Sequence, residues 1–143
     1  SFGGTKNGMM YGEAIVFFNK DLAHDFMYSR KQGLQLASKM RYISAQFIAY
    51  LSNNQWQTTA THANRMAKIL EEKVRKIEAI TITQPVEANA VFAIVPSHII
   101  SKLQEEYFFY VWDEDRSEVR WMTSWDTTED DIEKFVQKIR ELI

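Results

Sequence analysis

The sequence predicts a mainly helical chain that ends in a small α+β domain with an antiparallel sheet, and three observations support this fold class. The second half of residues 22–51 and the region 56–77 carry apolar side chains every three or four positions, as amphipathic helices do. From about residue 79 the apolar runs become short and alternate with polar residues, as strands do. Apolar residues make up 45% of the 143 residues and charged residues 25%, which is the balance of a globular protein with a core.

The N-terminal third is predicted to contain a loop, a strand and a long helix. Most of the chain's glycines lie in the first twelve residues and predict a loop with unusual backbone dihedrals: Gly3, Gly4, Gly8 and Gly12. The apolar run Glu13–Phe18 predicts a buried strand. A helical region is then predicted from about Leu22 to Leu51, with Asn19 or Asp21 as its N-cap.

The middle of the chain predicts a second long helix. Ser52-Asn53-Asn54 interrupts the first helical region, and the next helix is expected from Trp56 to about Ile77. Its apolar stripe predicts the buried face, which consists of Ala63, Met66, Ala67, Leu70, Val74 and Ile77. Its charged residues, Glu71 among them, are expected on the solvated face.

The C-terminal part predicts the order strand, helix, strand, strand, helix. The expected ranges are 91–95, 97–106, 108–112, 118–125 and from about 128 to the end. The polar residues 113–116 predict a hairpin turn. Asp126 or Thr127 is expected to cap the last helix, whose apolar stripe consists of Ile132, Phe135, Val136, Ile139 and Leu142. Alternation along the strand 118–125 predicts that Val119, Trp121, Thr123 and Trp125 face the core.

Composition and charge argue against several classes of function. The chain contains no cysteine, which excludes disulfides, thiolate nucleophiles and cysteine-based metal sites and favours the cytoplasm. Its net charge of −2 comes from 17 basic and 19 acidic residues, and the basic residues form no block. A positively charged surface that binds nucleic acid or an anionic membrane is therefore not expected. The longest apolar runs are too short to span a bilayer, and the first residues lack a signal-peptide pattern.

Lys6 is the first candidate for chemistry. It lies in Gly3-Gly4-Thr5-Lys6-Asn7-Gly8, directly before the predicted strand. A lysine that binds a carbonyl cofactor needs a fixed place, small neighbours let the backbone approach it, and the hydroxyl of Thr5 can reach a phosphate. From spacing alone, a solvated lysine on a frayed terminus is the favoured interpretation.

Arg120 is the second candidate. Alternation places Arg120, Met122 and Ser124 on the strand face opposite the aromatic core side. A guanidinium there can grip a substrate carboxylate with two parallel hydrogen bonds, which lysine does poorly. An arginine on the wet face of an antiparallel sheet is the alternative.

The other candidates are weaker. Lys39 and Arg41 lie two positions apart on a helix, so they point to different faces and do not easily share a ligand. The three histidines, His24, His62 and His98, are scattered, without a second ligand at metal-binding spacing. No phosphate loop of the dinucleotide or P-loop type is present.

Three segments together resemble a family of fold type I pyridoxal-phosphate enzymes, the threonine aldolases and aromatic amino acid β-eliminating lyases. The first is residues 1–8 followed by 13–18, which is similar to the segment holding the cofactor lysine. The second is residues 30–41, which ends in Met-Arg as in the family, although the glycine-rich stretch before it is here Leu36-Ala37-Ser38-Lys39. The third is Val119–Asp126, which resembles the C-terminal strand with its carboxylate-binding arginine.

The resemblance covers essentially the whole chain and implies an α/β enzyme of the aspartate-aminotransferase type, of which this is the C-terminal part. Residues 1–80 would end the large cofactor domain, and residues 81–143 would form the small C-terminal domain. Lys6 would hold pyridoxal 5′-phosphate, with Thr5 and Arg41 as further cofactor contacts. Arg120 would bind the carboxylate of an amino-acid substrate.

The implied activity is the cleavage of L-threonine and related β-hydroxy amino acids to glycine and an aldehyde. The resemblance also implies a homo-oligomer, dimer or tetramer, and a missing N-terminal part with the ring-stacking residue, the aspartate for the ring nitrogen and the general base. Elimination of a β-substituent from an amino acid and a stand-alone α+β binding module remain open as alternatives. The reaction products distinguish β-elimination from aldol cleavage. Mass spectrometry of the purified protein, which reveals or excludes an N-terminal partner chain, distinguishes a stand-alone module from a part of an enzyme.

Overall fold

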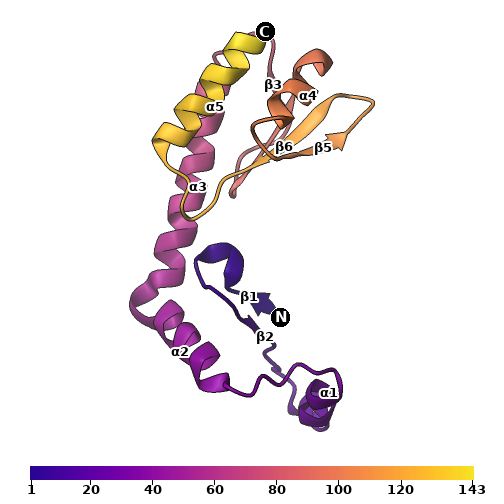
Figure 1. Cartoon of the computed structure of the whole chain (residues 1–143), viewed down its shortest axis with the longest axis vertical. Coiled ribbons are helices and arrows are strands. Elements are labelled where there is room, and N and C mark those ends of the chain that lie inside the picture. The colour runs from indigo at the N-terminus through magenta and orange to yellow at the C-terminus, as the bar shows by residue number, and fades with distance from the viewer. The chain divides into compact units, whose positions relative to one another are not determined.

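A computed structural model describes all 143 residues, which form two compact units, Ser1–Gln57 and Thr58–Ile143. Helices dominate the chain, and an antiparallel sheet lies in its C-terminal part (Figure 1), so the predicted fold class is confirmed. The domain boundary expected near residue 80 concerns the complete enzyme and stays a prediction. None of the helices is long and apolar enough to cross a membrane.

The first unit contains two short strands and two helices, which are β1 (Phe2–Gly3), β2 (Glu13–Ala14), α1 (Phe26–Gln32) and α2 (Met40–Leu51). The prediction of a buried strand over Glu13–Phe18 is wrong, because the strand ends at Ala14 and neither of its two residues is buried. Ile15 and Val16 are about half exposed and Phe18 is 97% exposed. A strand becomes buried only where other elements cover it, and in this chain β2 pairs with the two residues of β1 alone.

The single helical region predicted from Leu22 to Leu51 is also wrong. The chain forms α1 and α2, and between them Leu34 adopts a left-handed backbone with φ of 56°. The N–H groups of Gly33 and Gln35 bond to carbonyls of α1 at 2.9 Å, which closes the end of that helix. Asn19 does act as a cap, but for a short 3₁₀ turn at Lys20–Ala23, where it accepts from the N–H of Asp21.

The predicted break after α2 is confirmed. Ser52–Asn54 forms a 3₁₀ turn in which Asn53 and Asn54 have positive φ values of 52° and 56°. Asparagine tolerates this left-handed conformation better than most residues, which explains why the chain changes direction here.

The second unit contains most of α3 and one four-stranded sheet. The elements are α3 (Gln55–Val74), β3 (Thr81–Ile82), β4 (Ala90–Ile94), α4 (Ser97–Gln104), β5 (Tyr110–Asp113), β6 (Glu118–Met122) and α5 (Glu129–Leu142). The strand order is β3-β4-β6-β5 with antiparallel pairing throughout. The sequence did not predict β3, whose two residues give no periodic signal.

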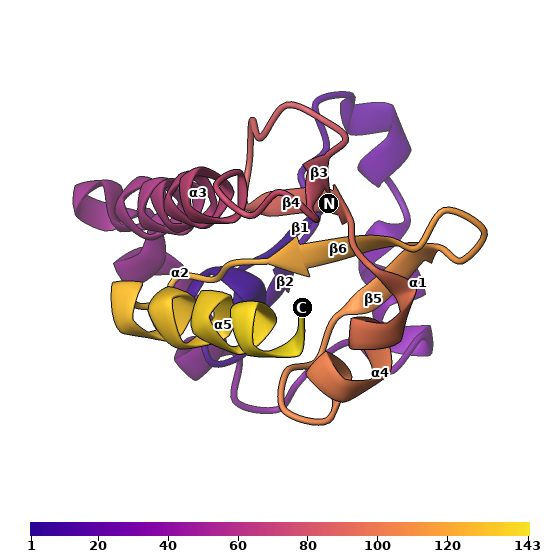
Figure 2. The same cartoon turned by 90° about the horizontal axis from the view of Figure 1, so that it is seen from above.

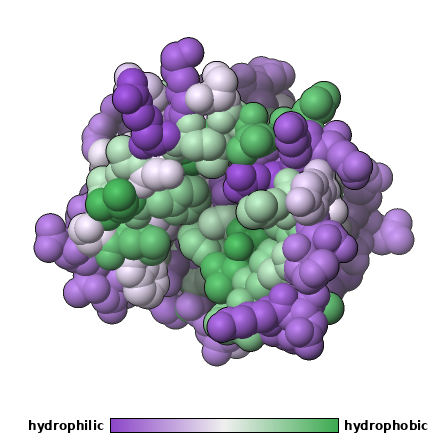
Figure 3. All heavy atoms as spheres, turned by 90° about the horizontal axis from the view of Figure 1, so that it is seen from below, coloured by the Kyte–Doolittle hydropathy of each residue, from purple (hydrophilic) through white to green (hydrophobic).

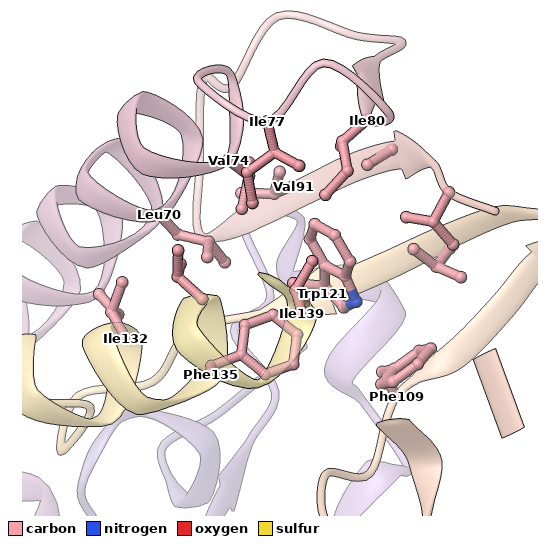
Figure 4. Close-up of a cluster of buried hydrophobic side chains, with 14 of the residues drawn as sticks. Leu70, Val74, Ile77, Ile80, Val91, Phe109, Trp121, Ile132, Phe135 and Ile139 are labelled. Atoms are coloured by element: carbon pink, nitrogen blue, oxygen red, sulfur yellow. The ribbon is translucent and has the colours of Figure 1, made fainter. Parts of the chain in front are cut away.

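One face of this sheet packs against helices, and α3 and α5 lie along it (Figure 2). The predicted stripes of both helices are buried there, as are alternate residues of β4 and β6. The close-up in Figure 4 shows side chains from α3, α5 and the strands meeting around Trp121, including Leu70, Phe135 and Ile139. Fully burying an aliphatic or aromatic side chain of this size stabilises a fold by about 1.5–3 kcal/mol.

Three local predictions in this unit need correction. Glu71 is buried on α3, because Lys68 and Arg75 bond to its two carboxylate oxygens. Trp125 is 43% exposed, since β6 ends at Met122 and the alternation stops there. The cap of α5 is Thr128, whose side chain accepts from the N–H of Asp131 in a capping box.

Candidate functional site

Lys6 lies in a tight loop that β1 and β2 close. Thr5–Asn7 forms a 3₁₀ turn, and the N–H of Gly4 bonds to the carbonyl of Gly12 at 3.1 Å. The Lys6 side chain is exposed and belongs to no ion pair of the chain. Its amine is therefore available to a ligand.

Two glycines make this loop possible. A Cβ at Gly4 would overlap the side chain of Met9, which is buried beneath the loop. Gly8 ends the 3₁₀ turn with φ of 99°, a left-handed conformation that glycine adopts without strain. The glycine-rich sequence thus fixes the backbone on both sides of Lys6.

Asn7 anchors the turn to the neighbouring helices. Its side-chain amide donates hydrogen bonds to the hydroxyl of Tyr50 at 2.7 Å and to the carbonyl of Trp56 at 2.9 Å. No local sequence pattern indicates this role of Asn7, because its partners lie more than forty residues away. The residue beside Lys6 is therefore held by tertiary contacts.

The remaining candidates of the first unit are exposed. Thr5 shares the 3₁₀ turn with Lys6, so these two candidates lie together. Arg41 lies in the first turn of α2, where its guanidinium is 5.2 Å from the centre of the Tyr42 ring. Lys39 precedes that helix and is also exposed.

The histidines make local contacts. His24 lies 3.1 Å from the exposed Asp25, and His62 is bonded to the carbonyl of Thr127 at 2.7 Å. His98 lies in the first turn of α4. No group of three or more histidine, aspartate or glutamate side chains is placed to hold a metal ion.

Arg120 lies at the centre of the sheet in the second unit, on the face away from the helices. Its strand, β6, runs between β4 and β5, and its register partners are Phe92 and Tyr110. The predicted alternation is confirmed over Val119, Trp121 and Thr123, which are all buried. Arg120 therefore points to the opposite face, as predicted.

The guanidinium of Arg120 is surrounded by aromatic rings instead of carboxylates. It lies 5.1 Å from the ring centre of Trp112 and 5.4 Å from that of Tyr110, and no ion pair of the chain includes it. Its Nε is buried and has no hydrogen-bond partner. A buried donor without an acceptor costs about 1–3 kcal/mol, so an acceptor from outside this chain would stabilise the arrangement.

The candidates of the first unit fit part of a pyridoxal-phosphate site. Lys6 offers a free amine in a loop whose backbone is fixed by glycines, and Thr5 offers a hydroxyl in the same turn. Arg120 offers donors for a carboxylate.

Comparisons with known proteins point to one group of enzymes. The chain is 43% identical over 141 residues to a low specificity L-threonine aldolase of Pseudomonas aeruginosa, and 41% identical over 142 residues to one of another Pseudomonas strain. Both comparisons cover 99% of this chain. A solved structure of Leishmania major threonine aldolase matches 98% of the chain with a TM-score of 0.86 and 29% identity.

The chain spans only about two fifths of the length of these proteins. It covers 40% and 41% of the two curated relatives and 42% of the solved chain. No model of a protein family matches the chain.

Proposed function

This chain is related to the threonine aldolases over almost its whole length, and we propose that it is the C-terminal part of a pyridoxal-phosphate enzyme that cleaves L-threonine and related β-hydroxy amino acids to glycine and an aldehyde. The observation that carries the proposal is the free Lys6 amine, held in a glycine-fixed turn within a chain that is 43% identical to such an enzyme. We call the longer protein to which the chain would belong the complete enzyme.

In the complete enzyme, Lys6 would hold the cofactor through its amine, and it would exchange a proton with the substrate during turnover. Thr5, in the same turn, and Arg41, on α2, are proposed to contact the cofactor from this unit. When bound, pyridoxal phosphate supplies an electron sink for a bond that breaks at the substrate Cα.

Arg120 is proposed to bind the substrate carboxylate. Because a guanidinium presents parallel N–H donors, it fixes the orientation of a carboxylate as well as its position. Orientation of the carboxylate decides which bond of the substrate Cα is aligned for cleavage. A general base must also accept the proton of the β-hydroxyl group, and we expect that base in the part of the enzyme outside these residues.

The complete enzyme is proposed to be a cytoplasmic homo-oligomer, on the strength of the resemblance to its relatives. Its partners would be the amino-acid substrate and the N-terminal part of its own chain.

Borohydride reduction of the complete enzyme tests the proposal. We expect it to fix the cofactor to the peptide that contains Lys6, and we expect Lys6→Ala to abolish both the label and threonine cleavage. Lys20→Ala is the matched control, because Lys20 is an exposed lysine of the same unit and it lies in a 3₁₀ turn too. A label on another lysine would overturn the assignment of Lys6.

The products of the same enzyme test the reaction. Glycine and acetaldehyde from threonine support aldol cleavage. Pyruvate and ammonia from an amino acid with a β-leaving group, without cleavage of threonine, would establish β-elimination instead.

A further inference from the structure

Three aromatic residues from the two strands that flank β6 lie around Arg120 on the face of the sheet away from the helices. Phe92 of β4 and Tyr110 of β5 are its register partners on either side. Trp112 of β5 comes closest, with its ring centre 5.1 Å from the guanidinium carbon. The side chains of Tyr110 and Trp112 are 55% and 54% exposed. Burial of apolar surface therefore does not explain why two aromatic residues lie on this face of the sheet.

A β-bulge lies at Trp112, which shares the face of Tyr110 because it is two residues further along β5. The pairing of β5 with β6 shifts between Val111 and Asp113, which makes Trp112 the extra residue of the strand. The rings of Trp112 and Phe92 meet edge to face at 5.2 Å, although β6 runs between their strands. Neighbouring strands lie about 4.8 Å apart, so β4 and β5 are separated by twice that distance. The two rings therefore extend toward each other over β6, the strand that carries Arg120.

The acidic residue nearest along β6 is engaged elsewhere. Glu118 lies two positions before Arg120, hence on the same face, and it is buried. Its carboxylate accepts a hydrogen bond from the hydroxyl of Thr83 and pairs with Arg116 at 3.5 Å. Arg120 is left with a full charge, aromatic neighbours and an unpartnered Nε.

An aromatic ring attracts a guanidinium without using its N–H donors. The ring carries negative potential on its face, whereas the donors of the guanidinium lie in its own plane. A carboxylate neighbour would instead occupy those donors and neutralise the charge. Aromatic contacts therefore hold such an arginine in place and leave it competent to bind an anion.

We propose that Trp112 and Tyr110 are positioning residues, which hold the guanidinium of Arg120 and keep its N–H donors free for the planar carboxylate of the substrate. This inference rests on the proposed function for the identity of the ligand. Its observational basis is the aromatic environment of Arg120, the bulge at Trp112 and the engagement of Glu118 by other partners.

The test uses the complete enzyme with its cofactor bound. We expect Trp112→Leu and Tyr110→Leu each to raise the KM for threonine, and the Kd of glycine measured by calorimetry, about three- to tenfold, since a cation–π contact contributes that much. The kcat should change less than about twofold, and cofactor absorbance should stay unchanged. Trp112→Phe should recover most of the affinity, and Trp125→Leu, which removes a half-exposed tryptophan outside the strands, should leave it unchanged.

A double-mutant cycle decides whether these residues act through Arg120. In an Arg120→Ala background, Trp112→Leu should cause little further loss of glycine affinity. An equal loss with and without Arg120, or an unchanged Kd in Trp112→Leu, would overturn the inference. An enzyme that binds glycine with this coupling but does not cleave threonine would refute the proposed function and leave the inference standing.

Discussion

Asn7 and Tyr50 are joined by a 2.7 Å hydrogen bond that ties the residue after Lys6 to the last turns of α2. The same amide of Asn7 also reaches the carbonyl of Trp56 at 2.9 Å. Because both partners are distant in sequence, the place of the Lys6 turn depends on the packing of the first unit. The amine of Lys6 itself stays free.

Asn7→Ala should therefore loosen the turn. The substitution removes two hydrogen bonds with a net value of about 0.5–1.5 kcal/mol each, so we expect the free energy of unfolding to fall by about 1–3 kcal/mol. We also expect weaker cofactor retention, measured by absorbance after dialysis of the complete enzyme. Tyr50→Phe removes only one of the bonds and should have about half the effect. Equal cofactor retention in all three proteins would contradict a role for Asn7 in holding Lys6.

Arg120→Ala should weaken kcat/KM for threonine about ten- to a hundredfold in the complete enzyme. A charge-assisted hydrogen bond contributes about 1.5–3 kcal/mol, and cofactor binding at Lys6 should remain intact. Arg120→Lys should recover little, since an ammonium does not reproduce the two-pronged contact of a guanidinium. Near-normal kinetics of the alanine variant with bound cofactor would move the carboxylate site elsewhere.

The 143-residue chain by itself should bind pyridoxal phosphate weakly and cleave no threonine, because residues expected for the ring and its nitrogen are not in it. It should also self-associate. Apolar residues, coloured green, are exposed on the face of the molecule that Figure 3 shows. The large hydrophobic residues of the first unit that are exposed include Met10, Ile15, Val16, Phe18 and Leu22. Light scattering measures the association, and Phe18→Asp should reduce it. A monomer that cleaves threonine unaided would refute the proposal that the chain is a part of a longer enzyme.

Glu71 should make the stability of the second unit depend on pH. The hydrogen bonds from Arg75 hold the pKa of this carboxyl below its usual value of 4.5, with a further contribution from Lys68, against the opposing effect of burial. A lowered pKa in the folded state means that the stabilisation is present above about pH 4.5 and is lost as the pH falls through the lowered value. Urea unfolding at several pH values measures this dependence.

Glu71→Gln is the matched variant for that measurement. At neutral pH it should unfold more easily than the parent by about 1–2 kcal/mol, a modest value because Arg75 and Lys68 are themselves half exposed. The difference should shrink as the solution becomes acidic. A constant difference at every pH would mean that Glu71 stabilises the unit through packing and not through its charge.

Thr128→Ala should destabilise α5 by about 1 kcal/mol. The Thr128 hydroxyl accepts the N–H of Asp131 at 3.1 Å, and alanine leaves that donor without a partner. Ser101→Ala, an exposed serine inside α4, is the control for losing a hydroxyl without losing a cap. Thermal unfolding of the two variants distinguishes them, and equal midpoints would argue against the cap.

The sequence by itself predicted the elements whose signal is local. The apolar stripe of α3, the stripe of α5 and the alternation along β6 each repeat with the period of their element, so they identify the buried face directly. The loop around Lys6 was likewise predicted from its glycines. The proposed roles of Lys6, Thr5, Arg41 and Arg120 came from a resemblance to a family, because residue spacing alone favoured solvated side chains.

Only the tertiary structure decided the contacts between distant segments. Strand pairing set which rings lie beside Arg120, because it brought β4 and β5 to the two sides of β6. Glu71 is buried together with its bonds to Lys68 and Arg75, and a break at Leu34 divided the predicted helical region into two helices. Each outcome depends on register, on burial or on a single backbone dihedral. These are properties of the folded chain that short-range periodicity does not encode, and for that reason they are absent from the local sequence pattern.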